Sequence, residues 1–375
     1  MSYKIPLFDL NVGAEEEQAV VKTIRSKWIS MGANVREVEE MFCSRLDAAH
    51  SIAVTNCTAA LHLAMKILGV SAGDEVIVPS LTFVATANAV LYMGATPVFA
   101  DIQGVEDFSI DPADIEKKIT PRTKAIVVMH YGGFSCDMDR IMSMAKKHGV
   151  YVVEDAAHAP NSGYKGKKLG AIGDMGCFSF YSNKNISCGE GGLLITNNKA
   201  FGERARLLRS HGMTTVAYDR AKGHATTYDV VDLGYNFRMD DIRAAMLVEQ
   251  IKKLDDDTRA RKVLRERYVE ALDGVPGLRI PYLEHVQPSS NYIFPVVIEE
   301  GGASRRDAIR ERLKEKGIET SIHYPPVHKF SVYEPYRVEL PNTEFVAEHE
   351  FTLPLYKALG IDEIKYISDQ LRSSL

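Results

Sequence analysis

Long apolar segments and paired cysteines are both missing from this sequence of 375 residues. No stretch approaches the roughly 18 consecutive apolar residues of a membrane-spanning helix, so we expect no membrane partner. The five cysteines are scattered and never spaced as Cys-x-x-Cys, which argues against a metal or redox site and for reduced thiols. The first residues also lack the charged and apolar regions of a signal peptide. Together these absences favour a cytoplasmic protein.

An excess of basic residues is missing as well. The formal net charge is -5 and the pI is about 6.2, which argues against nucleic-acid binding through a broad basic surface. Hydrophobic residues make up 45% of the chain, enough for a sizeable core, and the length is typical of two or three domains. This balance is typical of a soluble metabolic enzyme.

Short apolar runs alternate with helical patterns over the first part of the chain. The runs are rich in β-branched residues, which is typical of buried strands: 75–78, 96–100, 125–129 and 151–153. The segments between them carry apolar residues at helical spacing: 59–68, 84–93 and 138–148. Two further strands are expected at 178–181 and 193–196, joined around Gly191 and Gly192. The alternation predicts an α/β domain with a mostly parallel sheet.

The second part of the chain has a different pattern. Apolar residues amid dense charge over residues 240–272 predict a long amphipathic helix that bridges two domains. Three segments typical of a smaller α+β domain follow it: 291–298, 304–316 and 319–323. We therefore expect residues 1–240 to form an N-terminal segment and a large domain, and residues 241–375 to form the bridging helix and a small C-terminal domain.

Lys184 lies between an aromatic strand and a glycine-rich turn, about 30 residues after the strand that ends in Glu154 and Asp155. Pyridoxal phosphate (PLP) chemistry needs an amine that forms a Schiff base and a carboxylate that keeps a pyridine nitrogen protonated. Lys184 and Asp155 can supply these two groups. The competing interpretations are a solvated loop lysine and a carboxylate that caps a helix or turn, for which Glu154 serves equally well.

Seven sequence blocks resemble the DegT/DnrJ/EryC1/StrS family of sugar aminotransferases, in order and spacing, over nearly the whole chain. The blocks are Trp28-Ile-Ser-Met-Gly32, Asn56-Cys-Thr-Ala-Ala-Leu-His62, Pro79-Ser-Leu-Thr-Phe83, Glu154-Asp-Ala-Ala-His-Ala159, the run around Lys184, Gly234-Tyr-Asn-Phe-Arg-Met239 and His323-Tyr-Pro-Pro326. The resemblance implies a PLP enzyme of fold type I, the aspartate aminotransferase-like fold. It also implies a homodimer with active sites at the subunit interface.

The resemblance further implies which residues bind the cofactor. Backbone N–H groups at Thr58 and Ala59, where a strand turns into a helix, would bind the PLP phosphate, and Ser179 would add a hydroxyl. Phe83 and His158 would cover the two faces of the pyridine ring. Each residue taken alone has an ordinary structural explanation, namely a helix N-cap at Thr58, an alternating strand residue at Ser179, and core packing for the other two.

The remaining site positions also rest on the resemblance. It selects Asp155 rather than Glu154 as the partner of the pyridine nitrogen. Asn236 matches a residue that reaches the cofactor from the partner subunit, and Arg238 and His323 match positions on the substrate side. The competing interpretation of Asn236 and Arg238 is a polar loop that precedes the long helix. No metal site is expected, because no carboxylate or cysteine cluster accompanies the histidines of this region.

These residues predict an aminotransferase that carries an amino group, from glutamate in most relatives, to a nucleotide-linked keto sugar. The tail from Lys184 to Gly192 is more similar to relatives that act at sugar C4 than to those that act at C3. Amination at C3, aminocyclitol transamination, a PLP-dependent sugar dehydration and a non-catalytic PLP-binding regulator stay open at this point. Retention of Lys184 argues against the dehydration, because the relatives that catalyse it have histidine there.

Overall fold

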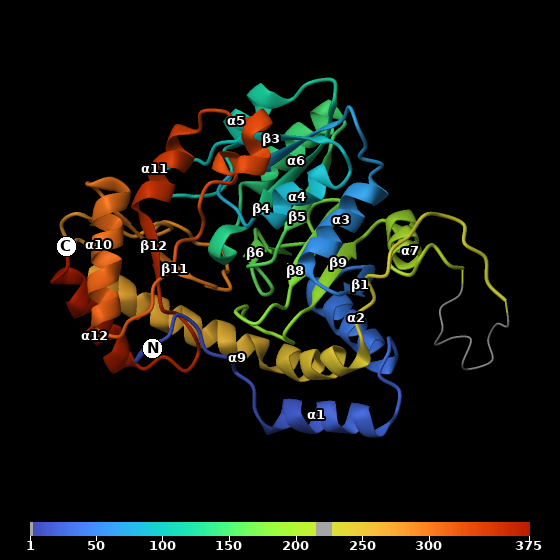
Figure 1. The fold of residues 1–375 in the computed structure, drawn as a ribbon, viewed down its shortest axis with the longest axis horizontal. Helices are drawn as coiled ribbons and strands as arrows, with labels where there is room; N and C mark the ends of the chain where they lie inside the picture. The colour runs from blue at the N-terminus through green and yellow to red at the C-terminus, as the bar shows by residue number, and fades with distance from the viewer. Residues whose placement is uncertain (1–2, 215–226) are drawn as a thin grey trace.

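A mixed seven-stranded sheet forms the centre of the molecule (Figure 1). The computed structural model describes residues 3–214 and 227–375. The strands are β1 (His50–Val54), β2 (Glu75–Pro79), β3 (Thr96–Ala100), β4 (Thr123–Met129), β5 (Tyr151–Asp155), β8 (Met175–Ser179) and β9 (Gly192–Thr196). Their order is β1-β9-β8-β5-β4-β2-β3. Strand β9 is antiparallel to both neighbours and the other pairs are parallel, which confirms the predicted α/β class.

Helices cover both faces of this sheet. Because side chains alternate along a strand, Ile52 and Val54 pack into one hydrophobic cluster while Ala53 packs into another. The first cluster takes its helical residues mainly from α3 (Cys57–Ile67), α4 (Ala85–Leu91) and α7 (Lys199–Leu208). The second takes them from α2 (Ala33–Leu46), α5 (Pro112–Lys118), α6 (Met138–His148) and the first half of α9 (Asp241–Leu272).

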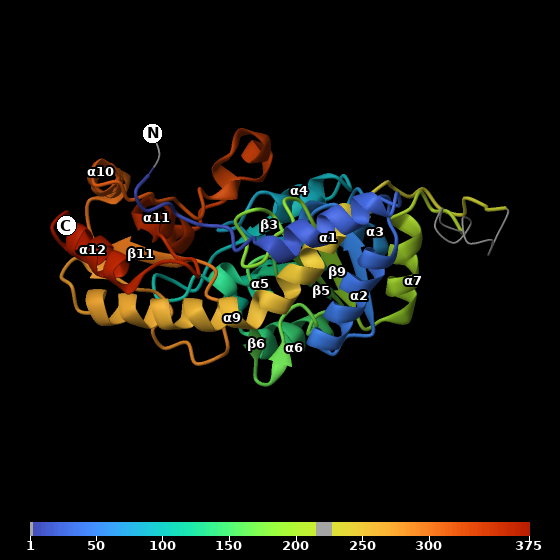
Figure 2. The same cartoon turned by 90° about the horizontal axis from the view of Figure 1, so that it is seen from below.

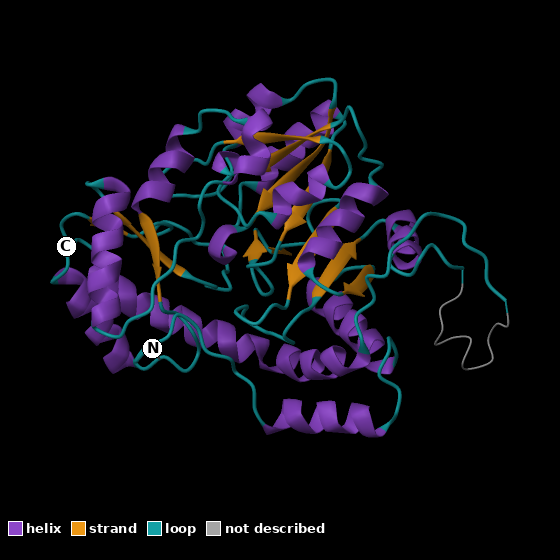
Figure 3. Ribbon diagram, viewed as in Figure 1, coloured by secondary structure: helices purple, strands orange, loops and turns teal. Residues whose placement is uncertain are grey.

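A second, smaller sheet lies at the other end of α9, as the two groups of strands in Figure 3 show. It consists of β10 (Leu278–Arg279), β11 (Phe294–Ile298) and β12 (Glu350–Leu353), in that order and all antiparallel. Three helices accompany it: α10 (Gly302–Glu315), α11 (Pro341–His349) and α12 (Ile361–Arg372). The small sheet, α10 and α12 share a hydrophobic cluster, into which Ile5 from the beginning of the chain also packs. Ile5 forms a bridge with Ile318. The boundary at residues 240 and 241 stays a prediction.

The long helix α9 runs past both sheets (Figure 2). Its first residues, such as Leu247, pack under the large sheet, whereas Tyr268 and Leu272 pack under the small one. Asp240 caps the helix by accepting a hydrogen bond from the Arg243 N–H at 2.9 Å. Helix α1 (Ala14–Arg25) lies alongside α9. The long helix predicted over residues 240–272 is therefore confirmed, from its cap to its last residue.

Most expected elements occur close to their expected bounds, and helix 138–148 matches its prediction. The strand expected at 178–181 instead begins at Met175 and ends at Ser179. The segment 319–323 forms only a single bridge, between Ser321 and Thr352. The remaining short elements are β6 (Gly163–Tyr164), β7 (Lys167–Lys168), η1 (Tyr131–Gly133), η2 (Val327–Lys329) and η3 (Ser331–Tyr336). Among the described residues, no helix has the length and apolar character needed to cross a membrane.

Candidate active site

Lys184 lies in the loop between β8 and β9, and its ammonium group faces the ring of Tyr292. The Nζ atom is 4.3 Å from the centre of that ring, a distance typical of a cation–π contact. Burial lowers the pKa of Lys184 to about 8, although the Asp155 and Cys57 side chains act in the opposite direction. A lysine with this pKa is a better nucleophile and proton acceptor at neutral pH than a solvated lysine.

Asp155 is the last residue of β5 and lies at the carboxyl edge of the sheet, where α/β proteins bind ligands. Its Oδ2 atom accepts a hydrogen bond from Thr86 Oγ1 at 2.7 Å, and its Oδ1 atom accepts one from the Ala157 N–H at 3.2 Å. The side chain is buried. Burial raises the pKa of Asp155, while Thr86, Ala157 and Lys184 oppose that shift by stabilising the ionised form.

Glu154 is fully engaged in structural hydrogen bonds. Its two carboxylate oxygens accept from the backbone N–H groups of Gly170, Ile172 and Gly173 at 2.6–2.7 Å. His130 Nε2 lies 2.9 Å from the same carboxylate. These partners hold the 170–173 turn against β5, so Glu154 has little capacity left for a ligand.

His158 is buried beside the lysine and belongs to an aromatic cluster. Its ring centre is 4.2 Å from that of Tyr292, and its Nε2 atom is 2.9 Å from the Tyr324 hydroxyl. Burial, followed by the charge of Lys184, lowers the pKa of His158 well below its usual value, so the ring is neutral. Because Nδ1 accepts from the Gly132 N–H at 3.3 Å, the ring proton lies on Nε2 and is donated to Tyr324.

Phe83 differs from the other expected cofactor residues because it is exposed. Its side chain is 55% exposed, and its ring centre is 6.0 Å from that of Tyr324. A large apolar ring held open to solvent at the rim of a buried polar cluster is suited to stacking on a ligand.

The N-terminus of α3 lies at the same edge of the sheet. Asn56 caps this helix, because its Oδ1 atom accepts from the Ala59 N–H at 2.9 Å. The cap is therefore Asn56 and not Thr58. The N–H groups of Cys57 and Thr58 form no hydrogen bond with the residues that the structure describes, so they are available to an anion.

Gly192 allows β9 to approach this helix end closely. A Cβ atom on Gly192 would lie 2.2 Å from the Asn56 carbonyl carbon and 2.5 Å from the Cys57 nitrogen. Gly189, by contrast, needs its glycine for a backbone φ of +83°. Ser179 pairs with Gly192 in the sheet, which brings its hydroxyl to the same edge.

Asn236 and Arg238 lie in the extended segment that leads into α9. Asn236 is exposed and forms a bridge with Ser210, whereas Arg238 bridges Val54 at the end of β1. Burial, followed by the charge of Arg209, lowers the pKa of Arg238. Within the described residues Arg238 has no carboxylate partner, which leaves its guanidinium group free for an anionic ligand.

His323 is buried near Lys184, and its Nδ1 atom is 2.8 Å from Thr352 Oγ1. Burial, followed by the charge of Lys184, lowers the pKa of His323 to about 3. His328 is occupied elsewhere, with Ser80 Oγ at 2.6 Å and Glu344 at 3.2 Å. In the part of the chain that the structure describes, no group of three or more potential ligands is arranged around a metal position.

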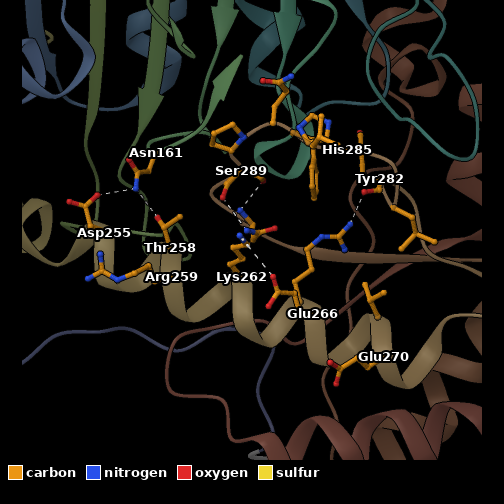
Figure 4. Close-up of a pocket in the computed structure, with 18 of the residues that line it drawn as sticks. Asn161, Asp255, Thr258, Arg259, Lys262, Glu266, Glu270, Tyr282, His285 and Ser289 are labelled. Carbon is orange, nitrogen blue, oxygen red and sulfur yellow. Dashed lines mark hydrogen bonds and ion pairs between the residues drawn. The ribbon is translucent and has the colours of Figure 1, made fainter. Parts of the chain in front are cut away.

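A groove of about 940 Å³ lies elsewhere, along α9 and the loop 281–291 (Figure 4). Several of its charged and polar residues pair with one another. Asn161 donates to Asp255 at 3.0 Å, and Arg265 donates to the Tyr282 carbonyl at 3.0 Å. None of the predicted site residues lines this groove, so it is separate from the candidate active site.

The structure brings together residues that the sequence had placed in separate blocks. Lys184, Asp155 and His158 meet at the edge of the sheet, and the end of α3 lies beside them. This arrangement fits PLP, because a half-buried lysine, a buried carboxylate and free helix N–H groups match its aldehyde, ring nitrogen and phosphate. Sequence reasoning missed Tyr292, which lies at the start of a segment expected only to be a strand.

Comparison with known proteins agrees with this geometry. Residues 11–372 match the model of the DegT/DnrJ/EryC1/StrS aminotransferase family. The chain is 38% identical over 379 residues to the spore coat polysaccharide biosynthesis protein SpsC of Bacillus subtilis, an alignment that covers 99% of this chain and 96% of that protein.

Solved structures are similar over the same length. Helicobacter pylori PseC, an aminotransferase involved in the biosynthesis of pseudoaminic acid, has a TM-score of 0.92 at 28% identity, with 99% of this chain and 98% of that chain covered. The PLP form of Spr1654 from Streptococcus pneumoniae, a proposed sugar aminotransferase, has a TM-score of 0.92 at 29% identity and the same coverage. The chain thus belongs to the DegT/DnrJ/EryC1/StrS aminotransferase family, and it is a sugar aminotransferase with PLP as its cofactor.

Proposed function

We propose that this enzyme transfers an amino group from glutamate to a nucleotide-linked keto sugar, at C4 rather than C3, and that it works as a homodimer. The single observation that carries the proposal is the half-buried Lys184 ammonium, with its lowered pKa, beside Asp155 and His158. The sugar class and carbon rest on sequence similarity around the 184–192 loop. The dimer rests on Asn236, whose family counterpart reaches a partner's site.

Lys184 is the residue that moves protons in this proposal. PLP, when bound, supplies an electrophilic carbon and a ring that accepts electrons from the donor α-carbon. A lysine of pKa about 8 is neutral in roughly a tenth of molecules at pH 7, so it can take a proton from the donor and return it. The Tyr292 ring face holds the ammonium form of Lys184 in place between these transfers.

Asp155 and the two flanking rings hold the cofactor ring in this proposal. Asp155 keeps the ring nitrogen protonated, and the Thr86 and Ala157 hydrogen bonds stabilise the aspartate charge that this requires. His158 covers one face and the exposed Phe83 covers the other. The Cys57 and Thr58 N–H groups and the Ser179 hydroxyl hold the phosphate, whereas the Ala59 N–H, which the sequence also assigned to it, is already donated to Asn56. Asn236 completes the site from the partner subunit.

Arg238 and His323 are the substrate-side residues. The guanidinium group of Arg238 has no carboxylate partner among the described residues, which suits the diphosphate of a nucleotide sugar. His323 is neutral and lies near Lys184, where it can bind a polar group of the sugar.

The amino donor and the sugar are tested in two separate steps. The purified enzyme should be yellow when loaded with PLP, and glutamate should bleach the visible band within one turnover. The bleached enzyme should then be mixed with nucleotide-linked 4-keto and 3-keto sugars, and mass spectrometry should detect an amino sugar from the 4-keto compound. Bleaching by glutamate with product only from the 3-keto sugar would reverse the C4 assignment and leave the donor intact.

A further inference from the structure

A chain of hydrogen bonds connects His323 to a buried carboxylate. His323 Nδ1 is 2.8 Å from Thr352 Oγ1, which in turn is 2.8 Å from Glu350 Oε1. The His323 backbone N–H donates to Glu350 Oε2 at 3.0 Å. The three side chains are almost fully buried. We call Glu350, Thr352 and His323 the His323 relay.

The single hydroxyl proton of Thr352 links the protonation state of Glu350 to that of His323. An ionised Glu350 can only accept, so Thr352 donates its hydroxyl hydrogen bond to Glu350 and accepts one from the Nδ1–H of His323, which leaves Nε2 without a proton. If Nε2 then takes up a proton, the Nδ1 proton moves to Thr352 and the Thr352 proton moves to Glu350. The result is a neutral imidazole with its proton on Nε2 and a neutral carboxylic acid, and no buried imidazolium persists.

The free end of the relay lies next to the reactive lysine. His323 Nε2 forms no hydrogen bond with any residue in the described ranges. His323 and Tyr292 line one cavity of about 20 Å³ together with Asn183, the neighbour of Lys184. The Asn183 Oδ1 atom there is buried and accepts no hydrogen bond from the residues that the structure describes. A cavity of this size holds one water-sized polar group, so the relay ends at a polar position beside the site.

We propose that Glu350 and Thr352 are positioning residues that set which ring nitrogen of His323 carries the proton, and that the relay delivers a proton at Nε2 to the oxygen of the keto sugar. Amination of a ketone releases that oxygen as water, so the site must supply protons to it. The inference rests on the proposed function, because the acceptor is a keto sugar. It goes further by naming the source of the proton.

The charges around the relay suit this task. Burial raises the pKa of Glu350 to about 8, while Thr352, the His323 N–H, Arg306 and Arg310 oppose the shift. Other titratable groups that interact with the relay are Tyr131, Tyr324, His158 and Lys184. A carboxyl group with this pKa exchanges its proton near neutral pH, as a general acid and base must.

Nitrogen NMR of the PLP-loaded enzyme, labelled with 15N-histidine, reads the tautomer directly, and the spectrum of His323→Asn identifies the signal. In the wild type, the His323 proton should lie on Nε2 at pH 6 and move to Nδ1 as the pH rises through about 8. Thr352→Val should abolish this change, and Thr352→Ser should retain it. Glu350→Gln donates through its amide and should hold the proton on Nε2 at every pH.

Kinetics of the two half-reactions provide the second readout. Thr352→Val and Glu350→Gln should slow amination of the keto sugar roughly ten- to a hundredfold in kcat with little change in KM, and Thr352→Ser should recover most of the rate. Bleaching by glutamate should stay within about twofold of wild type, which also shows that the variants fold and bind PLP. A wild-type tautomer change in Thr352→Val would overturn the relay. Failure of glutamate to bleach the wild type would instead overturn the proposed donor.

Discussion

The two adjacent carboxylates at the end of β5 differ in what surrounds them, although they are indistinguishable by residue type. Glu154 accepts hydrogen bonds from three backbone N–H groups and contacts His130. Asp155 accepts from one hydroxyl and one N–H and lies near Lys184. The first environment stabilises a turn, and the second leaves a charge available to a ligand.

Asp155→Asn should therefore affect mainly catalysis, and Glu154→Gln should affect mainly stability. Asp155→Asn removes the charge but keeps the shape, so PLP should still bind while the glutamate half-reaction slows by orders of magnitude. Glu154→Gln places an NH2 group against N–H donors and should lower the free energy of unfolding by about 2–4 kcal/mol. Stopped-flow bleaching and urea unfolding measure the two effects. If Asp155→Asn bleached at nearly the wild-type rate while a folded Glu154→Gln did not bleach, the carboxylate that partners the ring nitrogen would be Glu154 and not Asp155.

The lowered pKa of Lys184 implies that this lysine reduces the free energy of unfolding of the PLP-free enzyme by an amount that depends on pH. The pKa falls from its usual 10.5 to about 8 on folding, so the unfolded chain binds the proton more tightly. The cost is full below pH 8 and disappears as the pH rises toward 10.5.

Lys184→Met removes this cost and keeps the length of the side chain. At pH 7 it should raise the free energy of unfolding of the PLP-free enzyme by on the order of 1 kcal/mol, after allowance for partial exposure. The gain should shrink by pH 9.5. Urea unfolding of the wild type and of Lys184→Met at both pH values measures this difference in the free energy of unfolding. A difference that grows with pH would contradict the lowered pKa.

At the scale of elements, the site depends on how closely β9 approaches the first turn of α3. Gly192→Ala would place a methyl group 2.2 Å from the Asn56 backbone, so the helix end must move. We expect a loss of about 1–3 kcal/mol in stability and a weaker affinity for PLP. Gly189→Ala is the matched control nearby in the sequence, because no atom of the described residues lies within 4 Å of the added Cβ.

The control should cost about 1–2 kcal/mol through its positive φ alone and leave PLP affinity nearly unchanged. Fluorescence titration with PLP and thermal unfolding measure the two quantities. Equal losses of PLP affinity in both variants would mean that loop strain, rather than the contact with α3, controls the phosphate site.

The sequence predicted these elements well where one local signal dominates. The 138–148 helix has strong periodicity, and both this helix and the long helix α9 begin after a capping aspartate, so both were predicted almost to the residue. The cap of α3 was misjudged, because Asn56 and Thr58 are both good capping residues and only the backbone geometry selects Asn56. The sequence did not reveal Tyr292, because its role depends on a contact with Lys184, which is more than 100 residues away in the sequence. It did not reveal Glu350 and Thr352 either, because their roles depend on pairing with residues 321–323.

At the scale of the whole molecule, exposed apolar side chains near the site indicate a further contact surface. Phe83 is 55% exposed, and Leu233 in the segment before Asn236 is 78% exposed. Val230 and Val231 nearby are each more than half exposed. Large apolar side chains that are exposed in this way are typical of a subunit interface.

We therefore expect at least a dimer by light scattering at micromolar concentration. Lys184→Ala and Asn236→Ala should each be inactive alone. If Asn236 acts across the interface, mixing the two variants under exchange conditions should restore about a quarter of wild-type activity, because half of the dimers are mixed and each has one intact site. The control is Lys184→Ala alone under the same exchange conditions, which should stay inactive. A fully active monomer, or no recovery despite demonstrated exchange, would contradict a shared site.

The central claim is that Lys184 carries the cofactor of a sugar aminotransferase, and borohydride reduction of the PLP-loaded enzyme tests it most directly. Reduction fixes PLP covalently to the amine that holds it, and peptide mass spectrometry identifies that residue. We predict a single phosphopyridoxyl group on Lys184, and none on Lys184→Ala despite a native circular dichroism spectrum. A modified lysine elsewhere, with Lys184 unlabelled, would contradict the account.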